Sequence, residues 1–221
     1  MTVVADTVQV ILPCLNEAAA LGPVIEQIPA EYEVLLVDNG STDDSAAVAR
    51  SLGASVINCA DRGYGAACHA GLAAATAEIV AVMDADGSLD GGQLPRLVDP
   101  VRQRAVDLMI GTRRPVGPGA WPLRLRLANR ELARELSSRT GVPIRDLGAM
   151  RVARRTDLLT LKLKDRRSGY PAETVVAAAD AGWRIGQTEV DYRARIGRSK
   201  VTGSWLGSLR AVRDLRQAMA R

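Results

Sequence analysis

Five short apolar runs alternate with segments of helical spacing through the first half of the chain. An uninterrupted apolar run is typical of a strand buried on both faces of a parallel sheet. Helical segments between such strands provide the crossover connections that the sheet needs. The expected strands span residues 8–12, 31–38, 54–60, 78–86 and 106–114, and the expected helices span 17–29, 43–53, 63–77 and 91–105. This order predicts an α/β fold with a mostly parallel sheet and helices on both faces.

The pattern changes after Arg114, where Pro and Gly interrupt both periodicities. Residues 115–122 predict an irregular loop and a candidate lid. The later spacing predicts helices over 123–141 and 170–183, a strand or turn over 144–155 and a strand over 184–197. Residues 205–221 predict a basic amphipathic helix that follows a domain over residues 1–204. We expect this helix to dock on the domain, and an anionic membrane surface is the alternative.

Polar, glycine-bearing loops follow the expected strands. Parallel strands all point the same way, so the loops after them meet at one edge of the sheet, where ligands bind in folds of this kind. These loops span residues 13–17, 38–44, 61–65, 84–88 and 111–114. In the second of them, Ser41 or Thr42 is placed to cap the following helix. The functional site is therefore predicted at the carboxyl ends of the strands.

Charge is unevenly distributed in this chain of 221 residues, which has a formal net charge of +4. Asp and Glu are frequent before residue 100, whereas Arg dominates from residue 102 onward. An acidic half followed by a basic half predicts a metal ion on one side of the site and an anionic ligand on the other. The lack of Phe and the scarcity of Tyr give no support to nucleic-acid binding.

Three cysteines without CxxC spacing predict a reducing compartment rather than a disulfide scaffold or a structural zinc site. The first ten residues lack the regions of a signal peptide, and no apolar run has the length of a membrane span. We therefore expect a cytoplasmic protein, with peripheral contact at the inner face of the cell membrane as the alternative.

The sequence DADGSLD at residues 84–90 brings two carboxylates, Asp84 and Asp86, to the end of a buried strand. Phosphatases of the haloacid dehalogenase superfamily have this pattern, and their first Asp attacks phosphorus. Their motif normally follows the first strand of the domain, whereas three expected strands precede it here and no later acidic pair completes it. Sugar transferases use such a pair to hold a divalent ion against a nucleotide diphosphate. The position in the chain favours the transferase, and the phosphatase is the weaker alternative.

Eight motifs in consistent order resemble those of family 2 glycosyltransferases, which have the GT-A (nucleotide-diphospho-sugar transferase) fold. The motifs are VILPCLNE, LLVDNGSTDDS, DRGYGAACHAGL, VMDADGS, MIGTRR, DLGAMRVARR, GYPAETVVAAADAGWRI and VDYRARIGRSKVTGS, and they cover residues 8–204. The last three are similar to the branch of dolichyl-phosphate and other polyprenyl-phosphate mannosyl- and glucosyltransferases. The resemblance implies a Rossmann-like sheet and a divalent-metal-dependent transfer of a hexose from a UDP- or GDP-sugar.

Carried onto this sequence, the resemblance implies a metal site, a catalytic set and a nucleotide-sugar site. Mg²⁺ or Mn²⁺ would bind Asp84 and Asp86. The catalytic residues would be Asp86, Arg113, which meets the acceptor phosphate, and Asp146, which lies at the sugar end. The residues implied for the nucleotide sugar are Pro13, Asn16, Glu17, Asp38, Gly63, Gly65, Ala66, Asp84, Arg151, Arg195, Ser199 and Lys200.

Some of these positions carry a specific implied role or depart from the family pattern. Gly63, Gly65 and Ala66 are implied to let the backbone approach the nucleotide, where larger side chains would clash. Among the departures, Asn39 stands where a second Asp is usual, and Ser88 stands where some members carry a metal-binding Gln.

The acceptor determines how much acid–base chemistry the reaction needs. A phosphate oxygen is already anionic, so it needs Arg and Lys side chains to position it rather than a strong base. A hydroxyl acceptor would need a carboxylate to take its proton, and Asp146 is the candidate. A polyprenyl phosphate is the favoured acceptor, a hydroxyl is the alternative, and displacement in one step would invert the anomeric carbon. The sequence leaves the sugar, the base and the oligomeric state open.

Overall fold

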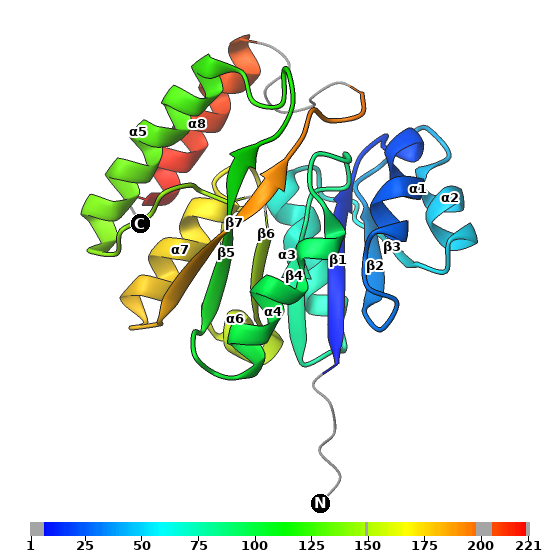
Figure 1. Cartoon of the computed structure of the whole chain (residues 1–221), viewed down its shortest axis with the longest axis horizontal. Coiled ribbons are helices and arrows are strands. Elements are labelled where there is room, and N and C mark those ends of the chain that lie inside the picture. Colours follow the sequence, from blue (N-terminus) through cyan, green and yellow to red (C-terminus); the bar gives the residue numbers. More distant parts are fainter. Residues whose placement is uncertain (1–6, 149, 198–204, 220–221) are drawn as a thin grey trace, which may run out of the picture.

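A computed structural model describes residues 7–148, 150–197 and 205–219, except for the side chains of residues 205–210. Its centre is a seven-stranded sheet in the order β3-β2-β1-β4-β6-β5-β7 (Figure 1). The strands are β1 (Val8–Cys14), β2 (Glu33–Asp38), β3 (Ser55–Asn58), β4 (Ile79–Val82), β5 (Leu108–Pro115), β6 (Met150–Arg154) and β7 (Ile185–Tyr192). Each expected strand is present, and the segment left open as a strand or a turn contains β6.

Strand β6 runs against its neighbours in the sheet. It is antiparallel to β4 and β5, whereas β1–β2, β1–β4, β2–β3 and β5–β7 are parallel pairs. The mostly parallel α/β sheet predicted from the apolar runs is therefore confirmed. Because β6 is reversed, its first residues lie at the edge where the other strands end. This reversal brings Asp146 and Arg151 to the carboxyl edge of the sheet.

Helices cover both faces of the sheet (Figure 1). They are α1 (Ala18–Glu26), α2 (Ser45–Ser51), α3 (Tyr64–Ala74), α4 (Pro95–Arg102), α5 (Leu123–Thr140), α6 (Arg155–Thr160), α7 (Tyr170–Asp180) and α8 (Trp205–Met219), with a short 3-10 helix at Gly91–Gln93. One core cluster packs α1, α2 and α4 against the sheet, and the other packs α3, α5, α7 and α8. Strand residues alternate between the two faces. In β1, for example, Val10 and Leu12 belong to the first cluster and Ile11 to the second.

The C-terminal helix α8 docks on the domain, as expected for its apolar stripe. It packs against α7 and α5, and Ala211, Ala218 and Met219 are buried there. Arg216 Nη2 lies 2.5 Å from Glu135 Oε1 on α5. None of the helices in the described ranges is both long enough and apolar enough to cross a bilayer.

Candidate functional site

The DADGS loop lies at the carboxyl end of β4. Asp86 Oδ1 accepts a hydrogen bond from Ser88 N at 3.0 Å, and Gly87 has a φ of +76°, which favours glycine. Asp86 is 5% exposed and Asp84 is half-buried. Ser88 Oγ is buried and has no hydrogen-bond partner among the described residues. The loop thus supplies two carboxylates and an unpaired hydroxyl oxygen within one short turn.

The segment that follows β7 lies over this loop. Arg193 N donates to Ser88 O at 2.8 Å, and Ile196 N donates to Asp86 O at 2.8 Å. Arg195 Nη1 lies 2.8 Å from Asp86 Oδ2. Backbone hydrogen bonds therefore fix the segment to the acidic loop and place Arg195 directly on a carboxylate.

The charges around Asp84 oppose one another. Burial, and then the negative charge of Asp86, raise the pKa of Asp84 to about 6. Arg151, Arg195 and Arg113 lower the pKa of Asp84, but by less. Two neighbouring carboxylates resist ionising together, and a bound cation removes that penalty. The pair is therefore electrostatically suited to a cation.

The donor atoms also fit a hard divalent cation. Mg²⁺ is typically held by one or two carboxylates together with substrate phosphates and water, rather than by a closed protein cage. Across the described ranges, no three His, Cys, Asp or Glu side chains gather as such a cage would require. Asp84 and Asp86 thus fit an ion that is shared with a bound diphosphate.

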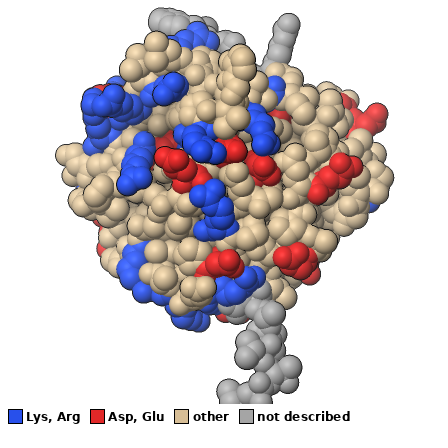
Figure 2. Space-filling model, in the orientation of Figure 1, with Lys and Arg blue, Asp and Glu red and all other residues tan. Residues whose placement is uncertain are grey.

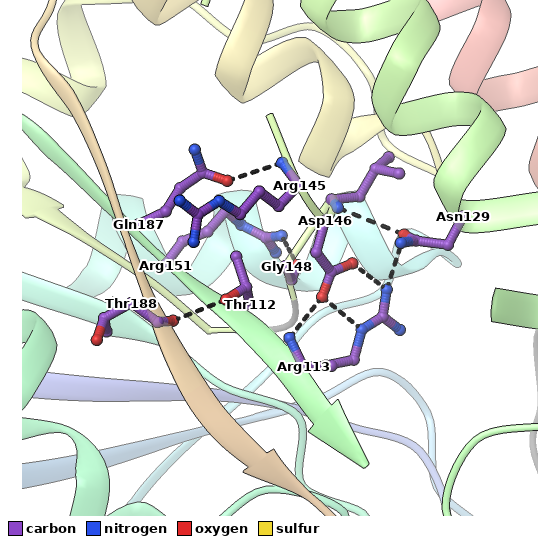
Figure 3. A network of polar contacts seen from close by, with 10 residues as sticks. Thr112, Arg113, Asn129, Arg145, Asp146, Gly148, Arg151, Gln187 and Thr188 are labelled. Atoms are coloured by element: carbon purple, nitrogen blue, oxygen red, sulfur yellow. Dashed lines mark hydrogen bonds and ion pairs between the residues drawn. The ribbon is translucent and has the colours of Figure 1, made fainter. Parts of the chain in front are cut away.

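Arg113 at the end of β5 and Asp146 before β6 form a buried bidentate ion pair (Figure 3). Arg113 Nε donates to Asp146 Oδ2 at 2.9 Å, Nη2 donates to Oδ1 at 2.5 Å, and the backbone N donates to Oδ2 at 2.8 Å. Asn129 Oδ1 on α5 accepts another bond from Nη2 at 2.9 Å. Burial alone would raise the pKa of Asp146, but the charge and hydrogen bonds of Arg113 hold this pKa below its usual value. Asp146 is therefore an anion that orients Arg113, and it is a weak proton acceptor.

Two aromatic rings enclose the guanidinium of Arg113. Its Cζ lies 4.1 Å from the centroid of the Trp121 ring and 5.4 Å from that of Tyr192. The two rings meet edge-on, with their centroids 5.7 Å apart. Both contacts are of the cation–π type, which stabilises a partly buried guanidinium. Since Trp121 belongs to the 115–122 loop, the expected lid is joined to the site through Arg113.

Arg151 reaches the site from the reversed strand β6. Its Nη1 donates to Gly148 O at 2.6 Å (Figure 3), and its Nη2 donates to Tyr64 Oη at 2.9 Å. Tyr64 is the first residue of α3, so this bond joins the two halves of the chain. Arg151 is 4% exposed, and its positive charge favours the ionised form of Asp84.

The loops after β1 and β2 are bound to each other at the other side of the site. Asn16 has a φ of +55°, and its Oδ1 accepts a hydrogen bond from Thr42 N at 2.7 Å. Ser41 Oγ accepts from Asn16 N at 2.9 Å, and Asp38 Oδ1 accepts from Ser41 N at 2.8 Å. Ser45 Oγ accepts from Glu17 N at 2.9 Å. These bonds fix the two loops as one unit.

The expected helix cap in this region is wrong. Helix α2 begins at Ser45 after Asp44, whose side chain does not cap it, and Ser45 N donates instead to Asp43 Oδ1 at 3.0 Å. Ser41 and Thr42 lie further from the helix than the expected cap requires, because their hydroxyl and amide groups bind Asn16. The long-range contact between the loops thus replaces the local one.

Asn39 holds the next loop. Its Nδ2 donates to Asp61 O at 2.6 Å and to Cys59 O at 3.3 Å, while its Oδ1 accepts from Gly63 N at 2.9 Å. Only an amide offers both donors and an acceptor, and an Asp at this position would face two carbonyl oxygens with no proton. The departure from the usual Asp therefore has a structural reason in this chain.

Gly63 and Gly65 lie against the loop of residues 165–167. A Cβ on Gly63 would come within 2.1 Å of a carbonyl oxygen of this loop, and one on Gly65 within 2.7 Å. Gly65 N donates to Arg167 O at 3.0 Å, and Ala66 N donates to Arg166 O at 2.9 Å. The loop of residues 165–167 therefore caps the start of α3. Among the described residues, this loop is what approaches Gly63 and Gly65 closely.

The structure gathers the expected site residues into two groups. A cluster of charges surrounds the acidic loop and comprises Asp84, Asp86, Arg113, Asp146, Arg151 and Arg195. The neighbouring ends of β1 and β2 carry Pro13, Asn16, Glu17 and Asp38. Ser199 and Lys200 lie outside the described residues.

Four further residues lie in this site and were not among the site residues expected from the sequence. They are Asn39, Tyr64, Asn129 and Tyr192. Asn39 carried a signal, because it departs from the family pattern, and the two tyrosines lie within the motifs DRGYG and VDYR. Asn129 is a helix residue with no local signal, and only the packing of α5 brings it to Arg113.

Comparisons with known proteins identify the family of this chain. The sequence model of glycosyl transferase family 2 matches residues 9–159. An uncharacterized glycosyltransferase of Mycobacterium tuberculosis is 50% identical over 210 residues, which is 95% of this chain and 96% of the relative. A dolichyl-phosphate hexose transferase of Haloferax volcanii is 30% identical over 200 residues, which is 89% of this chain and 87% of the relative.

Solved structures show the same fold with ligands. Glucosyl-3-phosphoglycerate synthase from Mycobacterium tuberculosis, in complex with Mn²⁺, uridine diphosphate and phosphoglyceric acid, superposes with a TM-score of 0.75 and 26% sequence identity. The match covers 96% of this chain and 77% of that chain. A complex of the same synthase with Mg²⁺ and uridine diphosphate gives a TM-score of 0.75 at 26% identity. The chain therefore belongs to glycosyl transferase family 2 and is a glycosyltransferase with the GT-A fold.

Proposed function

We propose that this enzyme moves a hexose from a UDP- or GDP-sugar to a polyprenyl phosphate, with inversion at the anomeric carbon. The observation that carries this proposal is the arrangement around the DADGS loop. Asp84 and Asp86 lie beside three arginines, of which Arg195 contacts Asp86 and Arg113 is held by Asp146. Carboxylates suited to a cation thus adjoin guanidinium groups suited to phosphate, which is the charge pattern that a diphosphate donor and a phosphate acceptor require.

The donor would lie across the ends of β1, β2 and β4. In this proposal Pro13, Asn16, Glu17 and Asp38 form the pocket for the base and ribose. The 63–66 segment borders the pocket. A divalent cation on Asp84 and Asp86 would neutralise the diphosphate as it leaves. The side chain of Arg195 is 30% exposed, and it would leave Asp86 to bind a diphosphate oxygen. In this proposal Ser199 and Lys200 would bind the donor diphosphate as well.

The acceptor would meet Arg113. Asp146 and Asn129 take the Nε and Nη2 hydrogens of Arg113, whereas no described residue accepts a hydrogen bond from its Nη1. Nη1 is therefore the group that we assign to the acceptor phosphate. The guanidinium plane is fixed beforehand by Asp146 and two aromatic rings, so little conformational freedom is lost when the phosphate binds.

The state of Asp146 supports a phosphate acceptor over a hydroxyl. A hydroxyl acceptor needs a base, but Arg113 lowers the pKa of Asp146 and occupies both of its oxygens. A phosphate oxygen attacks without losing a proton, so it needs only to be positioned. Asp146 then acts by orienting Arg113 and, with Arg151, by bordering the sugar.

A transfer assay with two acceptors tests this proposal. The protein with Mn²⁺ and a radiolabelled UDP- or GDP-hexose is given a polyprenyl phosphate in detergent, and the label is followed into an organic-soluble product. We expect transfer with one nucleotide family and none after chelation of the metal. A protein that transfers no label from any donor to the prenyl phosphate contradicts the proposal.

A soluble phosphorylated acceptor is the second candidate. It is favoured by the solved complexes of the synthase with phosphoglyceric acid, which share the fold over nearly the whole of this chain. Arg113 Nη1 would bind the phosphate of such an acceptor in the same way. The same assay with phosphoglyceric acid in place of the lipid gives a water-soluble labelled product if this second candidate is correct.

A further inference from the structure

Large apolar side chains are exposed at only one edge of the described surface. They are Val116, Leu123, Leu127 and Ile196, with exposed fractions of 39%, 67%, 57% and 41%. All lie on segments that leave the carboxyl ends of β5 or β7, namely the lid loop, the start of α5 and the segment after β7 (Figure 1). Single exposed apolar residues are ordinary, but exposure confined to one edge marks a contact surface.

The start of α5 has a second amphipathic face that points away from the core. Leu132, Ala133 and Leu136 are buried against the sheet side of the molecule. At about 100° per residue, Leu123 and Leu127 lie on the opposite side of the helix. We call these two leucines, with Arg126 and Arg130 beside them and Arg124 at the border, the leucine face. It is a separate apolar stripe, which packing among the described residues does not explain.

The basic residues of the leucine face lack acidic partners. Arg124, Arg126 and Arg130 form no ion pair with a described residue, whereas Arg139 further along α5 pairs with Asp180 at 3.0 Å. Figure 2 shows Lys and Arg over the part of the molecule where α5 lies in Figure 1. Exposed leucines bordered by unpaired arginines are complementary to an anionic lipid surface, which takes up both.

We propose that the leucine face binds the surface of an anionic bilayer and sets the acceptor side of the site at the level of the lipid headgroups. This inference rests on the proposed polyprenyl phosphate acceptor. The same helix that carries Leu127 outside carries Asn129 inside, where it holds Arg113. The lid that precedes α5 contacts Arg113 through Trp121. Docking of α5 therefore fixes the acceptor arginine relative to the membrane.

This surface differs from the helix that the sequence first suggested for membrane contact. Helix α8 is docked on α5 and α7, and Arg216 on it is paired with Glu135. Val212 and Leu215 of α8 pack against the core beside the buried Ala218 and Met219. Over residues 211–219, where its side chains are described, the apolar stripe of α8 is thus used within the domain, whereas no described residue covers Leu123 and Leu127 of α5.

Vesicle binding tests the inference without any sugar transfer. The protein is sedimented with vesicles of equal parts phosphatidylglycerol and phosphatidylcholine, and with vesicles of phosphatidylcholine alone, both free of prenyl phosphate. We expect binding to the anionic vesicles and little to the neutral ones. Leu123→Gln/Leu127→Gln should weaken that binding by roughly tenfold or more, because two apolar side chains no longer leave water.

Two double arginine variants distinguish binding by the leucine face from nonspecific electrostatic attraction of the protein to the anionic membrane. Arg126→Gln/Arg130→Gln and Arg50→Gln/Arg104→Gln remove the same charge from exposed positions, the second pair at the ends of α2 and α4. The first pair should weaken binding roughly fivefold per arginine and the second pair far less. Stabilisation of the folded state by UDP should be retained in all variants, which excludes unfolding as the cause.

Several results would overturn the inference. They are equal binding to both kinds of vesicle, equal loss from both arginine pairs, and unchanged binding of the leucine variant. Light scattering that shows a dimer dissociated by Leu123→Gln/Leu127→Gln, without vesicle binding, would assign the face to a second copy of the chain instead. Vesicle binding by a protein that transfers no sugar to a prenyl phosphate would support the surface and contradict the proposed acceptor.

Discussion

The two sides of the site are held together by different kinds of bond. The proposed donor side comprises β1 to β4 and the loops after them, where the amides of Asn16 and Asn39 and the hydroxyl of Ser41 bind backbone N–H and C=O groups. The proposed acceptor side comprises β5 to β7 and the loops after them, where ion pairs between guanidinium and carboxylate groups hold neighbouring segments together. These pairs are Arg113 with Asp146 and Arg114 with Asp191.

This difference has a functional consequence. Neutral hydrogen bonds to the backbone fix the shape of loops, which suits a donor whose base and ribose need a fixed pocket. Ion pairs fix charges, and a ligand phosphate can bind the free face of a guanidinium that a protein carboxylate already orients. The donor side is thus set by shape and the acceptor side by charge. The contact of Arg195 with Asp86 joins the two.

The largest effect is expected where the two sides meet. Asp86→Asn keeps the size of the side chain but removes a carboxylate from the proposed metal site and leaves Arg195 without its charged partner. Turnover should fall roughly a thousandfold or more, since cation stabilisation of the leaving group is worth several kcal/mol. Initial rates over a Mn²⁺ titration measure this effect.

Asp90→Asn is the matched control for this change. It makes the same substitution a few residues further on, where Asp90 Oδ1 accepts a bond from Gly92 N at 2.9 Å that an amide oxygen also accepts. The charge that it removes from the ion pair with Arg193, at 3.4 Å, contributes little, because this pair is partly exposed. Its rate should stay close to that of the unmodified protein. Equal losses in both variants would mean that the charge of Asp86 has no special role.

On the acceptor side, Arg113→Gln should destabilise the fold as well as reduce activity. It leaves the carboxylate of Asp146, which is 3% exposed, without a counter-charge. Breaking a buried pair in this way costs about 3–5 kcal/mol. Urea denaturation followed by circular dichroism measures the change in the free energy of unfolding.

Arg184→Gln removes one partner of a similar bidentate pair at the surface. The Arg184 side chain is 58% exposed and is bound to Asp107 at 2.8 Å. Water solvates both charges when this exposed pair is broken, so we expect little change in the free energy of unfolding. If both variants lost the same stability, burial would not be what distinguishes Arg113.

On the donor side, Asn39→Asp restores the residue that is usual in the family and tests the neutral network. The carboxylate would keep the bond from Gly63 N but would face the carbonyls of Cys59 and Asp61. We expect a loss of about 1–3 kcal/mol, distributed between stability and UDP affinity. Gln103→Glu, at an exposed position at the end of α4, adds the same charge away from the site and should leave both unchanged. Tighter UDP binding by Asn39→Asp would contradict the assigned role.

The smallest effect concerns pH. Burial and Asp86 raise the pKa of Asp84 to about 6. Above that value the carboxylate is ionised and available to a cation, and below it a proton must leave first. The Mn²⁺ affinity of the free protein should therefore fall as pH drops below 6, approaching about tenfold per pH unit. Calorimetric titration at several pH values measures the slope, which Asp84→Asn should reduce. A flat profile down to pH 5 would show that Asp84 does not control the binding.

Much of the fold could be predicted because the local pattern contains it. Continuous apolar runs such as 78–86 identified the buried strands, and the direction of parallel strands located the site at their ends. The direction of β6 could not be predicted, because the apolar pattern of a five-residue strand is the same in either direction. Its direction is determined by its pairing with β4 and β5. The cap expected at Ser41 or Thr42 was wrong for the same reason, since a partner distant in sequence, Asn16, takes these groups.

The site shows the same division between local and distant information. Asp84 and Asp86 could be found because both lie in one short motif, although that motif alone also matched a phosphatase. The family match shows that the phosphatase interpretation is wrong. The surroundings of Arg113 were not predictable, because Asn129, Trp121 and Tyr192 come from three separate segments that only packing brings together.

The loop that caps α3 has a consequence for how this chain can be divided. The family match ends at residue 159, yet the carbonyl groups that bind Gly65 N and Ala66 N belong to residues 166 and 167. A fragment cut at the family boundary would leave these amides without partners and Gly63 and Gly65 without the surface they pack against. The stretch that the family model matches is therefore shorter than the unit that satisfies these amides. That unit extends at least to the loop before α7.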